Sequence, residues 1–191
     1  MKQFLIVHSP NARKEETLKH LKENGIEPEV VECEQGNMPY VNVLETVKKI
    51  IRENIEEENI IIYEDDVRLY FKFSPAEIVD QLAGKFSMVS TGAFSLGETQ
   101  LTEIDGVLAC SHYYGAQCVI YHKSSFPLIL AIKDDYIDTI SRFTQKSAII
   151  VPFLTYQKDY GELNKDGQMI RREHQFKKES KRLEELIANG K

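Results

Sequence analysis

The first third of the chain alternates between short apolar runs and amphipathic stretches. A short apolar run bounded by polar residues is typical of a buried strand, whereas apolar residues three or four apart are typical of a helix. The sequence therefore predicts strands over residues 4–7, 28–33 and 59–63, with helices over 13–24 and 43–51 between them. The first strand–helix–strand unit implies a parallel pair of strands joined by a right-handed crossover.

The rest of the chain predicts shorter elements of the same two kinds. A polar, Gly-containing stretch over residues 90–106 is typical of a loop, and residues from 168 onward are typical of a charged amphipathic helix. The other expected elements are helices over 75–82, 124–132 and 135–143 and strands over 86–89, 117–121 and 148–151. We therefore expect one α/β domain over residues 1–160, followed by a charged C-terminal helical extension over residues 161–191.

Composition and charge narrow the class of protein. A hydrophobic content of 42% and a charged content of 28% are those of a soluble globular protein. The net charge of −6 gives no overall attraction to nucleic acid or to an anionic membrane, although residues 171–182 carry six basic and two acidic side chains.

The sequence also bears on the compartment. No stretch approaches the length of a membrane span, and the apolar start MKQFLIVHSPN is too short for a signal peptide. Cys33, Cys110 and Cys118 are odd in number and lack the spacing of metal ligands, which predicts reduced thiols. We expect a cytoplasmic protein without a transmembrane segment.

Three adjacent carboxylates, Glu64, Asp65 and Asp66, follow the third expected strand in the stretch NIIIYEDDVRLYF. Because like charges repel, such a cluster either attracts a cation or stays well solvated beside Lys or Arg. Ligands of open α/β sheets gather at the carboxyl ends of the strands, which is where this cluster is expected. Hard oxygen ligands suit Mg²⁺ or Mn²⁺, above all where substrate phosphates complete the coordination.

The acidic stretch, residues 63–67 (YEDDV), resembles the "LEDDV" metal-binding signature of family 25 glycosyltransferases of the lipooligosaccharide-biosynthesis type. Other segments are similar to parts of that family in the same order: FLIVHSPNARKEETLKHLKENGIEPEVVE at the start, GAQCVIY at 115–121 and IVPFLTYQ at 150–157. The resemblance covers roughly residues 3–157.

The resemblance implies a GT-A-like, Rossmann-type mixed sheet flanked by helices, and a divalent-metal-dependent glycosyltransferase. Such an enzyme moves a sugar from a nucleoside-diphosphate donor to a hydroxyl of a glycan or a lipid-linked saccharide, with Mn²⁺ or Mg²⁺ as cofactor. Carried over to this chain, Asp66 is the expected direct metal ligand and Glu64 lies near the metal and the donor ribose. Asp65 lines the donor site or only shapes the turn.

Further donor contacts are expected directly after the first strand, at Ser9, Pro10, Asn11 and Arg13. A helix N-terminus and an arginine fork both favour phosphate, although an ordinary strand–helix loop with an exposed arginine has the same appearance.

The sequence contains weaker signals for acceptor-binding residues than for donor-binding residues. An inverting transferase needs a carboxylate that deprotonates the acceptor hydroxyl, and Asp138 is the first candidate and Asp135 the second. Acids that cap a helix or lie in its first turn would show the same pattern. His112, Tyr113 and Tyr114 concentrate polar and aromatic groups before a strand and are candidates for acceptor binding, although such residues also fill loops and cores.

Two other functions remain open at this point. Residues 171–182 are either a solvated helix face or a dock for a polyanionic acceptor, and a phage-type glycosyltransferase that modifies a hydroxymethylated DNA base would use them in that way. Tyr113 and Tyr114 would then receive the flipped base. In the second alternative, a non-catalytic domain would bind a partner through the basic helix.

Overall fold

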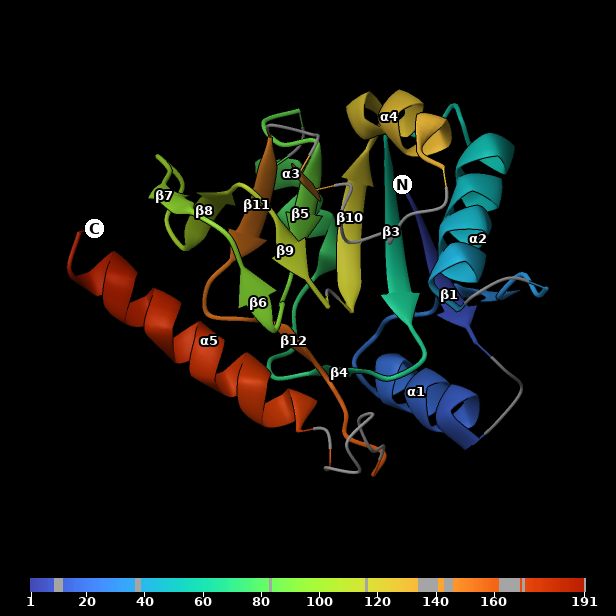
Figure 1. Ribbon diagram of the computed structural model, residues 1–191, viewed down its shortest axis with the longest axis horizontal. Helices are drawn as coiled ribbons and strands as arrows, with labels where there is room; N and C mark the ends of the chain where they lie inside the picture. Colours follow the sequence, from blue (N-terminus) through green and yellow to red (C-terminus); the bar gives the residue numbers. More distant parts are fainter. Residues whose placement is uncertain are drawn as a thin grey trace.

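The computed structural model describes residues 1–8, 12–36, 39–82, 84–115, 117–133, 141–142, 146–161, 169 and 171–190. An eight-stranded mixed sheet forms the middle layer of this part of the chain (Figure 1). Its strands are, in spatial order, β2 (Glu29–Glu32), β1 (Lys2–Val7), β3 (Asn59–Glu64), β10 (Cys118–His122), β5 (Met88–Ser90), β11 (Ser147–Ile150), β8 (Val107–Cys110) and β7 (Thr99–Leu101).

Two small ribbons and six helical segments complete the described structure. One ribbon pairs β12 (Thr155–Gln157) with β4 (Val67–Leu69), and the other pairs β6 (Ser95–Leu96) with β9 (Tyr113–Tyr114). The helical segments are α1 (Ala12–Glu23), α2 (Pro39–Glu53), α3 (Pro75–Leu82), the 3₁₀ turn η1 (Lys123–Ser125), α4 (Phe126–Ala131) and α5 (Arg172–Ala188).

Most strands of the large sheet run in one direction. β2 and β3 both pair in parallel with β1, β10 runs antiparallel between β3 and β5, and β11 is parallel to β5. The carboxyl ends of β1, β2, β3, β5 and β11 therefore meet at one edge of the sheet, which we call the carboxyl edge. The parallel β1–β2 pair expected from the first strand–helix–strand unit is confirmed.

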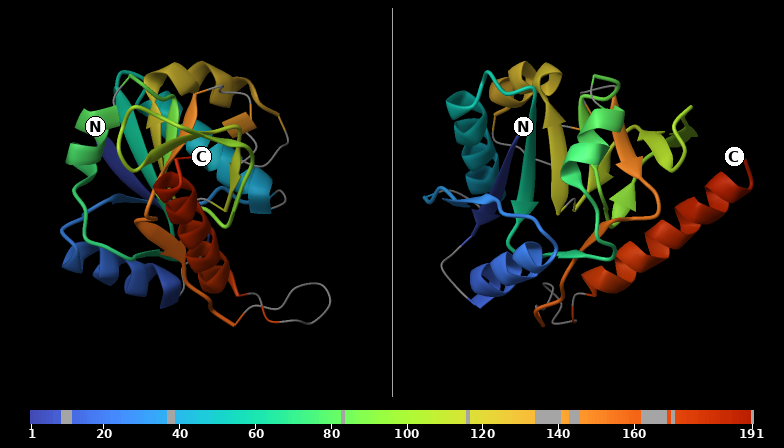
Figure 2. Two further views of the ribbon diagram at one scale, coloured as in Figure 1. Left: turned by 90° about the vertical axis from the view of Figure 1, so that its left-hand side faces the viewer. Right: turned by 180° about the vertical axis from the view of Figure 1, so that it is seen from behind.

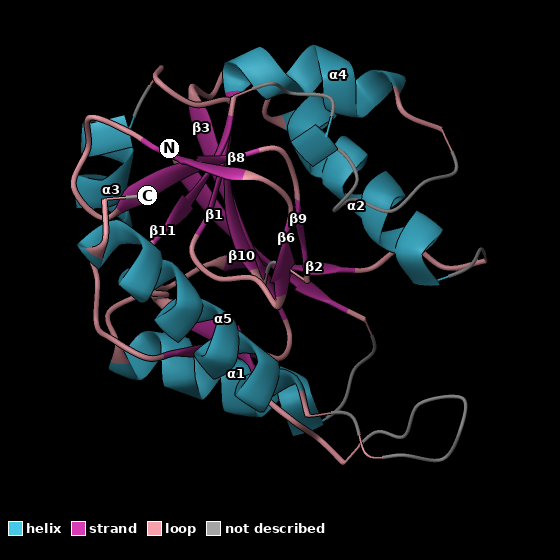
Figure 3. Cartoon of the chain, turned by 60° about the vertical axis from the view of Figure 1, so that its left-hand side comes forward, coloured by secondary structure: helices cyan, strands magenta, loops and turns pink. Residues whose placement is uncertain are grey.

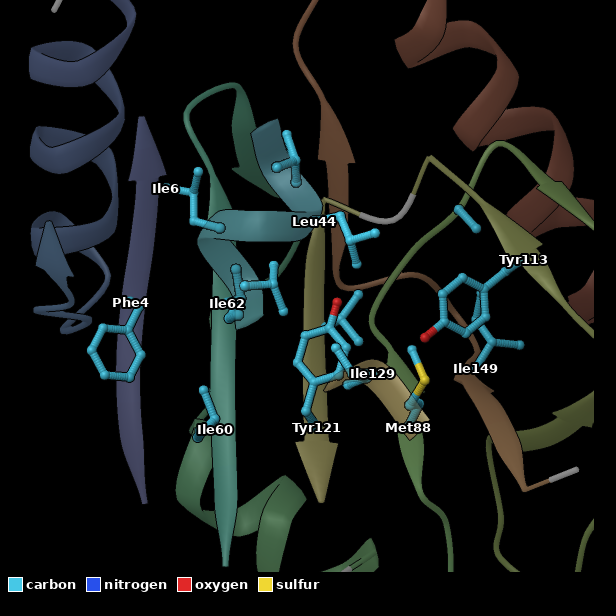
Figure 4. Close-up of a cluster of buried hydrophobic side chains, with 14 of the residues drawn as sticks. Phe4, Ile6, Leu44, Ile60, Ile62, Met88, Tyr113, Tyr121, Ile129 and Ile149 are labelled. Carbon is cyan, nitrogen blue, oxygen red and sulfur yellow. The ribbon is translucent and has the colours of Figure 1, made fainter. Parts of the chain in front are cut away.

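Helices cover both faces of the sheet (Figure 2). On the face that packs against α2, α4 and α5, here the α2 face, β3 contributes Ile60 and Ile62 to one buried cluster, part of which Figure 4 shows. On the opposite face, which packs against α1 and α3, β3 contributes Ile61 and Tyr63 to a second cluster. Burial on both faces explains why this strand is apolar at consecutive positions.

The helix boundaries follow the sequence signals. Gly25, two residues after the end of α1, has a φ of 79°, which glycine adopts without the steric cost that other residues incur. The Ser74 hydroxyl accepts a hydrogen bond of 3.4 Å from the backbone N–H of Glu77 and so caps α3.

The predicted C-terminal helix is confirmed as α5, and it packs against the rest of the fold (Figure 3). Phe176 and Leu183 are fully buried in the cluster on the α2 face. The Ser180 hydroxyl accepts a hydrogen bond of 3.1 Å from the backbone N–H of Phe153. The division into a domain over residues 1–160 and an extension over 161–191 stays a prediction.

The region expected to be a loop, residues 90–106, contains β6 and β7, and the sequence also did not predict β4, β8, β9 and β12. These strands have two to four residues each, too few to show a period of two against the surrounding turns. The helix expected over residues 135–143 lies almost entirely outside the described residues.

Two further expectations concern membranes and thiols. None of the helices in the described residues is long and apolar enough to cross a membrane. Cys33, Cys110 and Cys118 are buried and carry free thiols.

Candidate functional site

The acidic turn lies at the carboxyl edge, as the sequence predicted. Glu64 is the last residue of β3, Asp65 and Asp66 form the turn, and β4 begins at Val67. In Figure 1 the ribbon of β4 and β12 lies beneath the arrowhead of β3, between α1 and the start of α5. The turn is thus enclosed by segments from both ends of the chain.

Asp66 is held by the strand β12. It is 6% exposed, and its Oδ2 accepts a hydrogen bond of 2.8 Å from the Gln157 side-chain amide. The backbone N–H of Lys158 donates to the Asp66 carbonyl at 2.9 Å. The side chain and backbone of Asp66 are therefore fixed by the last residue of β12 and by the residue that follows it. A segment singled out by the family resemblance, residues 150–157, thus reaches the acidic turn.

The strand β12 is itself anchored to the end of β5. The hydroxyls of Thr91 and Thr155 lie 2.7 Å apart, and the backbone N–H groups of Leu154 and Thr155 donate to the Thr91 carbonyl at 2.7 and 3.2 Å. A Cβ atom on Gly92 would lie 2.1 Å from the Thr155 carbonyl oxygen, so this crossing requires glycine.

Asp65 joins the turn to β1 and α1. It is 1% exposed, its Oδ2 accepts a hydrogen bond of 2.9 Å from the His8 backbone N–H, and its carbonyl accepts one from the Thr17 hydroxyl. Its other carboxylate oxygen, Oδ1, is buried and has no hydrogen-bond partner in the part of the chain that the structure describes. These contacts match a residue that shapes the turn, and its role in donor binding stays a prediction.

Glu64 points out of the sheet edge with 23% of its side chain exposed. Its carboxylate lies 3.9 Å from the Nε2 of His8, a residue that sequence reasoning missed. The backbone N–H of Glu64 donates to the Gln117 carbonyl at 3.0 Å. The sequence marks His8 only by its position directly after the first strand. The strand that brings Glu64 beside His8 lies more than fifty residues further along the chain, so this neighbour is not visible in the local pattern.

Arg13 lies on α1 above an aromatic ring. Its guanidinium carbon is 4.6 Å from the ring centroid of Tyr160, whose hydroxyl accepts a hydrogen bond of 2.8 Å from the buried Arg68. Arg68 also pairs with Glu16 at 3.1 Å. A hydrogen bond from Lys158 and the nearby Arg68 lower the pKa of Glu16 to about 2. Two cations, Arg68 and Lys158, thus lie beside the Glu16 carboxylate on the α1 side of the turn, and Arg13 as a donor contact stays a prediction.

The acceptor candidates occupy different environments. Tyr113 is 1% exposed and its ring points into the cluster on the α2 face (Figure 4), so in this conformation it offers no surface to an acceptor. The Tyr114 ring is partly exposed, with the Arg142 guanidinium carbon 5.0 Å above it and the His112 ring 5.4 Å away, edge-on. An acceptor role for this segment therefore concerns His112 and Tyr114, and not the ring of Tyr113.

Several predicted residues lie outside the described part of the chain. These are the donor candidates Ser9, Pro10 and Asn11 and both candidates for the catalytic base, Asp135 and Asp138. Their roles stay predictions.

The donor set at the turn suits a metal that is held mainly by a substrate. Among the described residues no group of three or more His, Cys, Asp or Glu side chains is arranged to hold a metal ion. Glu64 and Asp66 offer carboxylate oxygens at one turn, and Mg²⁺ is commonly bound by one or two carboxylates together with substrate phosphates. Glu64 and Asp66 as ligands of a divalent cation that arrives with a diphosphate stay a prediction.

Two cavities in the described structure are lined by residues outside the acidic turn. One of about 180 Å³ lies where β11 begins, at the edge opposite the carboxyl edge, and is lined by Glu98, Gln100, Ala109, Cys110, Ser111 and Ser147. Another of about 350 Å³ lies at the start of α5 and is lined by Asp159, Met169, Arg171, Glu173, His174 and Lys177. His174 is thus a lining residue of that second cavity, whose lining includes no residue of the acidic turn.

Comparison with solved structures identifies similar folds. A197 from STIV matches with a TM-score of 0.59 at 12% identity, over 90% of this chain and 94% of that protein. HddC from Yersinia pseudotuberculosis, in complex with GMP-PN, matches with a TM-score of 0.50 at 9% identity, over 96% of this chain and 100% of that protein. A glycosyltransferase involved in the glycosylation of the major capsid of PBCV-1 matches with a TM-score of 0.44 at 11% identity, over 66% and 62%, which is too weak to carry an argument.

No protein-family profile matches the sequence, and no curated protein matches it either. The structural likeness, at these identities, concerns the fold. The chain has a GT-A-like, Rossmann-type mixed sheet flanked by helices with a C-terminal helix, which is the fold class that the sequence predicted.

Proposed function

We propose that this protein is a divalent-metal-dependent glycosyltransferase that moves a sugar from a nucleoside-diphosphate donor to an acceptor hydroxyl. The observation that carries the proposal is the acidic turn at the carboxyl edge of a GT-A-like sheet, with the Asp66 carboxylate oriented by Gln157. Open α/β sheets bind ligands at this edge. A carboxylate held there by a hydrogen bond is suited to a metal–diphosphate ligand.

The fold supports a nucleotide as the donor. HddC, which shares the fold at low identity, was solved with GMP-PN, so a sheet of this kind accommodates a nucleotide-like ligand in that protein. The resemblance to family 25 glycosyltransferases supports a sugar as the transferred group and a glycan or lipid-linked saccharide as the acceptor.

The residues of the turn have different proposed roles. Asp66 and Glu64 would hold Mn²⁺ or Mg²⁺, which when bound stabilises the negative charge that develops on the departing nucleoside diphosphate. Asp65 keeps the turn attached to β1 and α1 through His8 and Thr17. Asp138, or else Asp135, would take the proton of the acceptor hydroxyl.

The proposal is tested by calorimetry with Mn²⁺ and a panel of nucleoside diphosphates, UDP, GDP, CDP and dTDP. We expect binding of at least one of them that weakens when Mn²⁺ is omitted. Absence of binding to every member of the panel would overturn the transferase function.

The variant Asp66→Asn tests the metal assignment. It keeps the shape of the side chain and an oxygen for Gln157 but removes the charge, so we expect the Mn²⁺-dependent affinity to fall about tenfold or more, a change of about 1.4 kcal/mol. The thermal midpoint should change by no more than about 4 °C. Asp105→Asn, which alters an exposed carboxylate in a distant turn, is the control. Unchanged Mn²⁺-dependent binding in Asp66→Asn would contradict the assignment.

A further inference from the structure

The strand β4, which begins directly after the acidic turn, pairs with a strand on one side only. That partner is β12. The backbone N–H of Tyr70, directly after β4, donates to the Leu154 carbonyl, directly before β12, at 2.8 Å. Because the backbone groups of an antiparallel strand alternate in direction, those of Val67 and Leu69 are directed away from β12. Their N–H and C=O groups need partners on the outer edge of β4.

The helix α1 lies along this outer edge (Figure 1). The Thr17 hydroxyl donates to the Asp65 carbonyl in the acidic turn. The Nε2 atom of His20 accepts a hydrogen bond of 3.0 Å from the backbone N–H of Leu69. Thr17 and His20 are three positions apart and therefore share one face of the helix. Side chains of α1 thus take the place of a second neighbouring strand for β4.

The bond between His20 and Leu69 requires a neutral imidazole. A backbone N–H can only donate, so Nε2 carries the lone pair and the proton of the neutral ring is on Nδ1. In the imidazolium form both ring nitrogens are donors, and Nε2–H would face the N–H of Leu69. Protonation of His20 therefore breaks this bond and removes the acceptor of the β4 edge.

The surroundings of the ring also oppose its protonation. Partial burial is the main cause that lowers the pKa of His20 from its ordinary value of 6.5, followed by the nearby Arg68 guanidinium of β4. Lys158, after β12, acts in the same direction, whereas Glu23 and Glu16 of α1 raise the pKa by less. The unfolded chain thus binds more protons than the folded protein below about pH 6.5, so this contribution to stability is complete above that pH and is lost as the pH falls through the lowered pKa.

We propose that His20 is a positioning residue for the acidic turn, which it holds through β4 only as a neutral imidazole. Leu69 is three positions after Asp66 on this short strand, so release of its N–H on protonation loosens the segment that carries the Asp66 carboxylate. A mildly acidic pH then lowers the affinity for a metal–diphosphate ligand. This effect on binding rests on the proposed function, whereas the link between the proton and the β4 edge does not.

The test uses His20→Gln, which keeps a hydrogen-bond acceptor but does not titrate. Binding of Mn²⁺ with UDP, GDP, CDP and dTDP is measured by calorimetry at about pH 7.5 and about pH 5.5, on either side of the ordinary histidine pKa. We expect equal affinities at the higher pH, and a loss at the lower pH that is about three- to tenfold larger in the wild-type protein than in His20→Gln. Titration of the phosphates and of His8 is common to both proteins and cancels in this comparison. His174→Gln, at an exposed position of α5, is the matched control and should behave as the wild-type protein.

Two measurements without ligand test the link itself. Between the same two pH values, the thermal midpoint of the wild-type protein should fall by about 2–4 °C more than that of His20→Gln. An NMR titration of the wild-type imidazoles should give His20 a pKa below the ordinary 6.5. This titration does not depend on how well any variant folds.

Three results would overturn the proposal. The first is an ordinary or raised pKa of His20 in the NMR titration. The second is a parallel pH dependence of midpoint and affinity in His20→Gln and the wild-type protein. The third is a difference in midpoint without a difference in affinity, which would make His20 a structural contact only. Failure of the wild-type protein to bind any of the nucleoside diphosphates would overturn the proposed transferase function, while the midpoints and the NMR titration would still decide whether the proton controls the β4 edge.

Discussion

At the scale of single residues, the acidic turn consists of three adjacent carboxylates in three different environments. Glu64 is partly exposed beside His8, Asp65 is buried against the end of β1, and Asp66 is buried against Gln157. These three environments differ only because of the fold, since the neighbours of each carboxylate come from other strands. Their different contacts are the reason that we assign them different roles.

Gln157 is expected to be a positioning residue for Asp66. In Gln157→Leu the Asp66 carboxylate loses a hydrogen-bond donor, and partners of metal-binding residues typically contribute about 10–100-fold in metal affinity. We therefore expect the apparent affinity for Mn²⁺, titrated in the presence of a bound nucleoside diphosphate, to fall by about that factor. Binding of the nucleotide without metal should be unchanged, which a merely destabilised protein would not show.

The control for this prediction is Gln175→Leu, a glutamine exposed on α5. Both variants replace a glutamine with a leucine, so a loss of affinity in both would point to an unspecific effect. An unchanged Mn²⁺ titration in Gln157→Leu would show that Asp66 does not need this hydrogen bond.

The sequence located the acidic turn but not its partners. Glu64, Asp65 and Asp66 are adjacent and follow a strongly apolar strand, which is a local pattern. Gln157 lies 91 positions from Asp66, and Gln117 meets Glu64 only through the register of two antiparallel strands. Register depends on the packing of the whole sheet, so a single sequence without a structure does not reveal it.

At the scale of elements, long patterns were predictable and short ones were not. The helix α2 has fifteen residues with a clear apolar stripe, and β3 is apolar over nearly its whole length, so both agree with expectation. The ribbon of β4 and β12 has three residues in each strand, and it is this ribbon that brings Gln157 to the turn. The site therefore depends most on the elements that the sequence signals least.

The helix α5 is expected to contribute to the stability of the whole fold. Phe176 is fully buried between the rings of Phe94 and Phe153, with centroid distances of 6.4 and 6.3 Å. Phe176→Ala should lower the free energy of unfolding by about 3–5 kcal/mol, measured by urea denaturation. Lys178→Ala, exposed on the same helix, should change it by less than about 0.5 kcal/mol. A loss below about 1 kcal/mol in Phe176→Ala would mean that α5 is a detachable extension.

At the scale of the whole molecule, the charge distribution argues against DNA as the acceptor. The chain has a net charge of −6, and the basic residues of α5 are partly engaged within the protein. Lys177 pairs with Glu173 at 2.8 Å, and Arg182 pairs with Glu179 at 2.7 Å. Two of the six basic side chains over residues 171–182 are therefore paired within the helix, which weakens its attraction for a phosphate backbone.

We accordingly expect only non-specific binding to duplex DNA, with a dissociation constant of about 10⁻⁵ M or weaker at physiological salt. A gel-shift series over increasing salt measures it, and the double variant Lys178→Glu, Lys181→Glu tests the helix without removing the buried Phe176. Nanomolar binding that the double variant abolishes would restore the DNA-modifying alternative.

The three buried thiols allow the two faces of the sheet to be observed separately by chemical labelling. Burial raises the pKa of Cys33 and brings the pKa of Cys110 and of Cys118 to about 12, so few thiolates are present at neutral pH. Cys33 and Cys110 belong to the cluster on the α2 face, and Cys118 belongs to the cluster on the opposite face. Cys110 also lines the cavity where β11 begins, whereas Cys33 and Cys118 do not. A thiol reagent can therefore react with Cys33 and Cys118 only as fast as each layer opens, and the order in which these two are modified reports which helical layer separates from the sheet first.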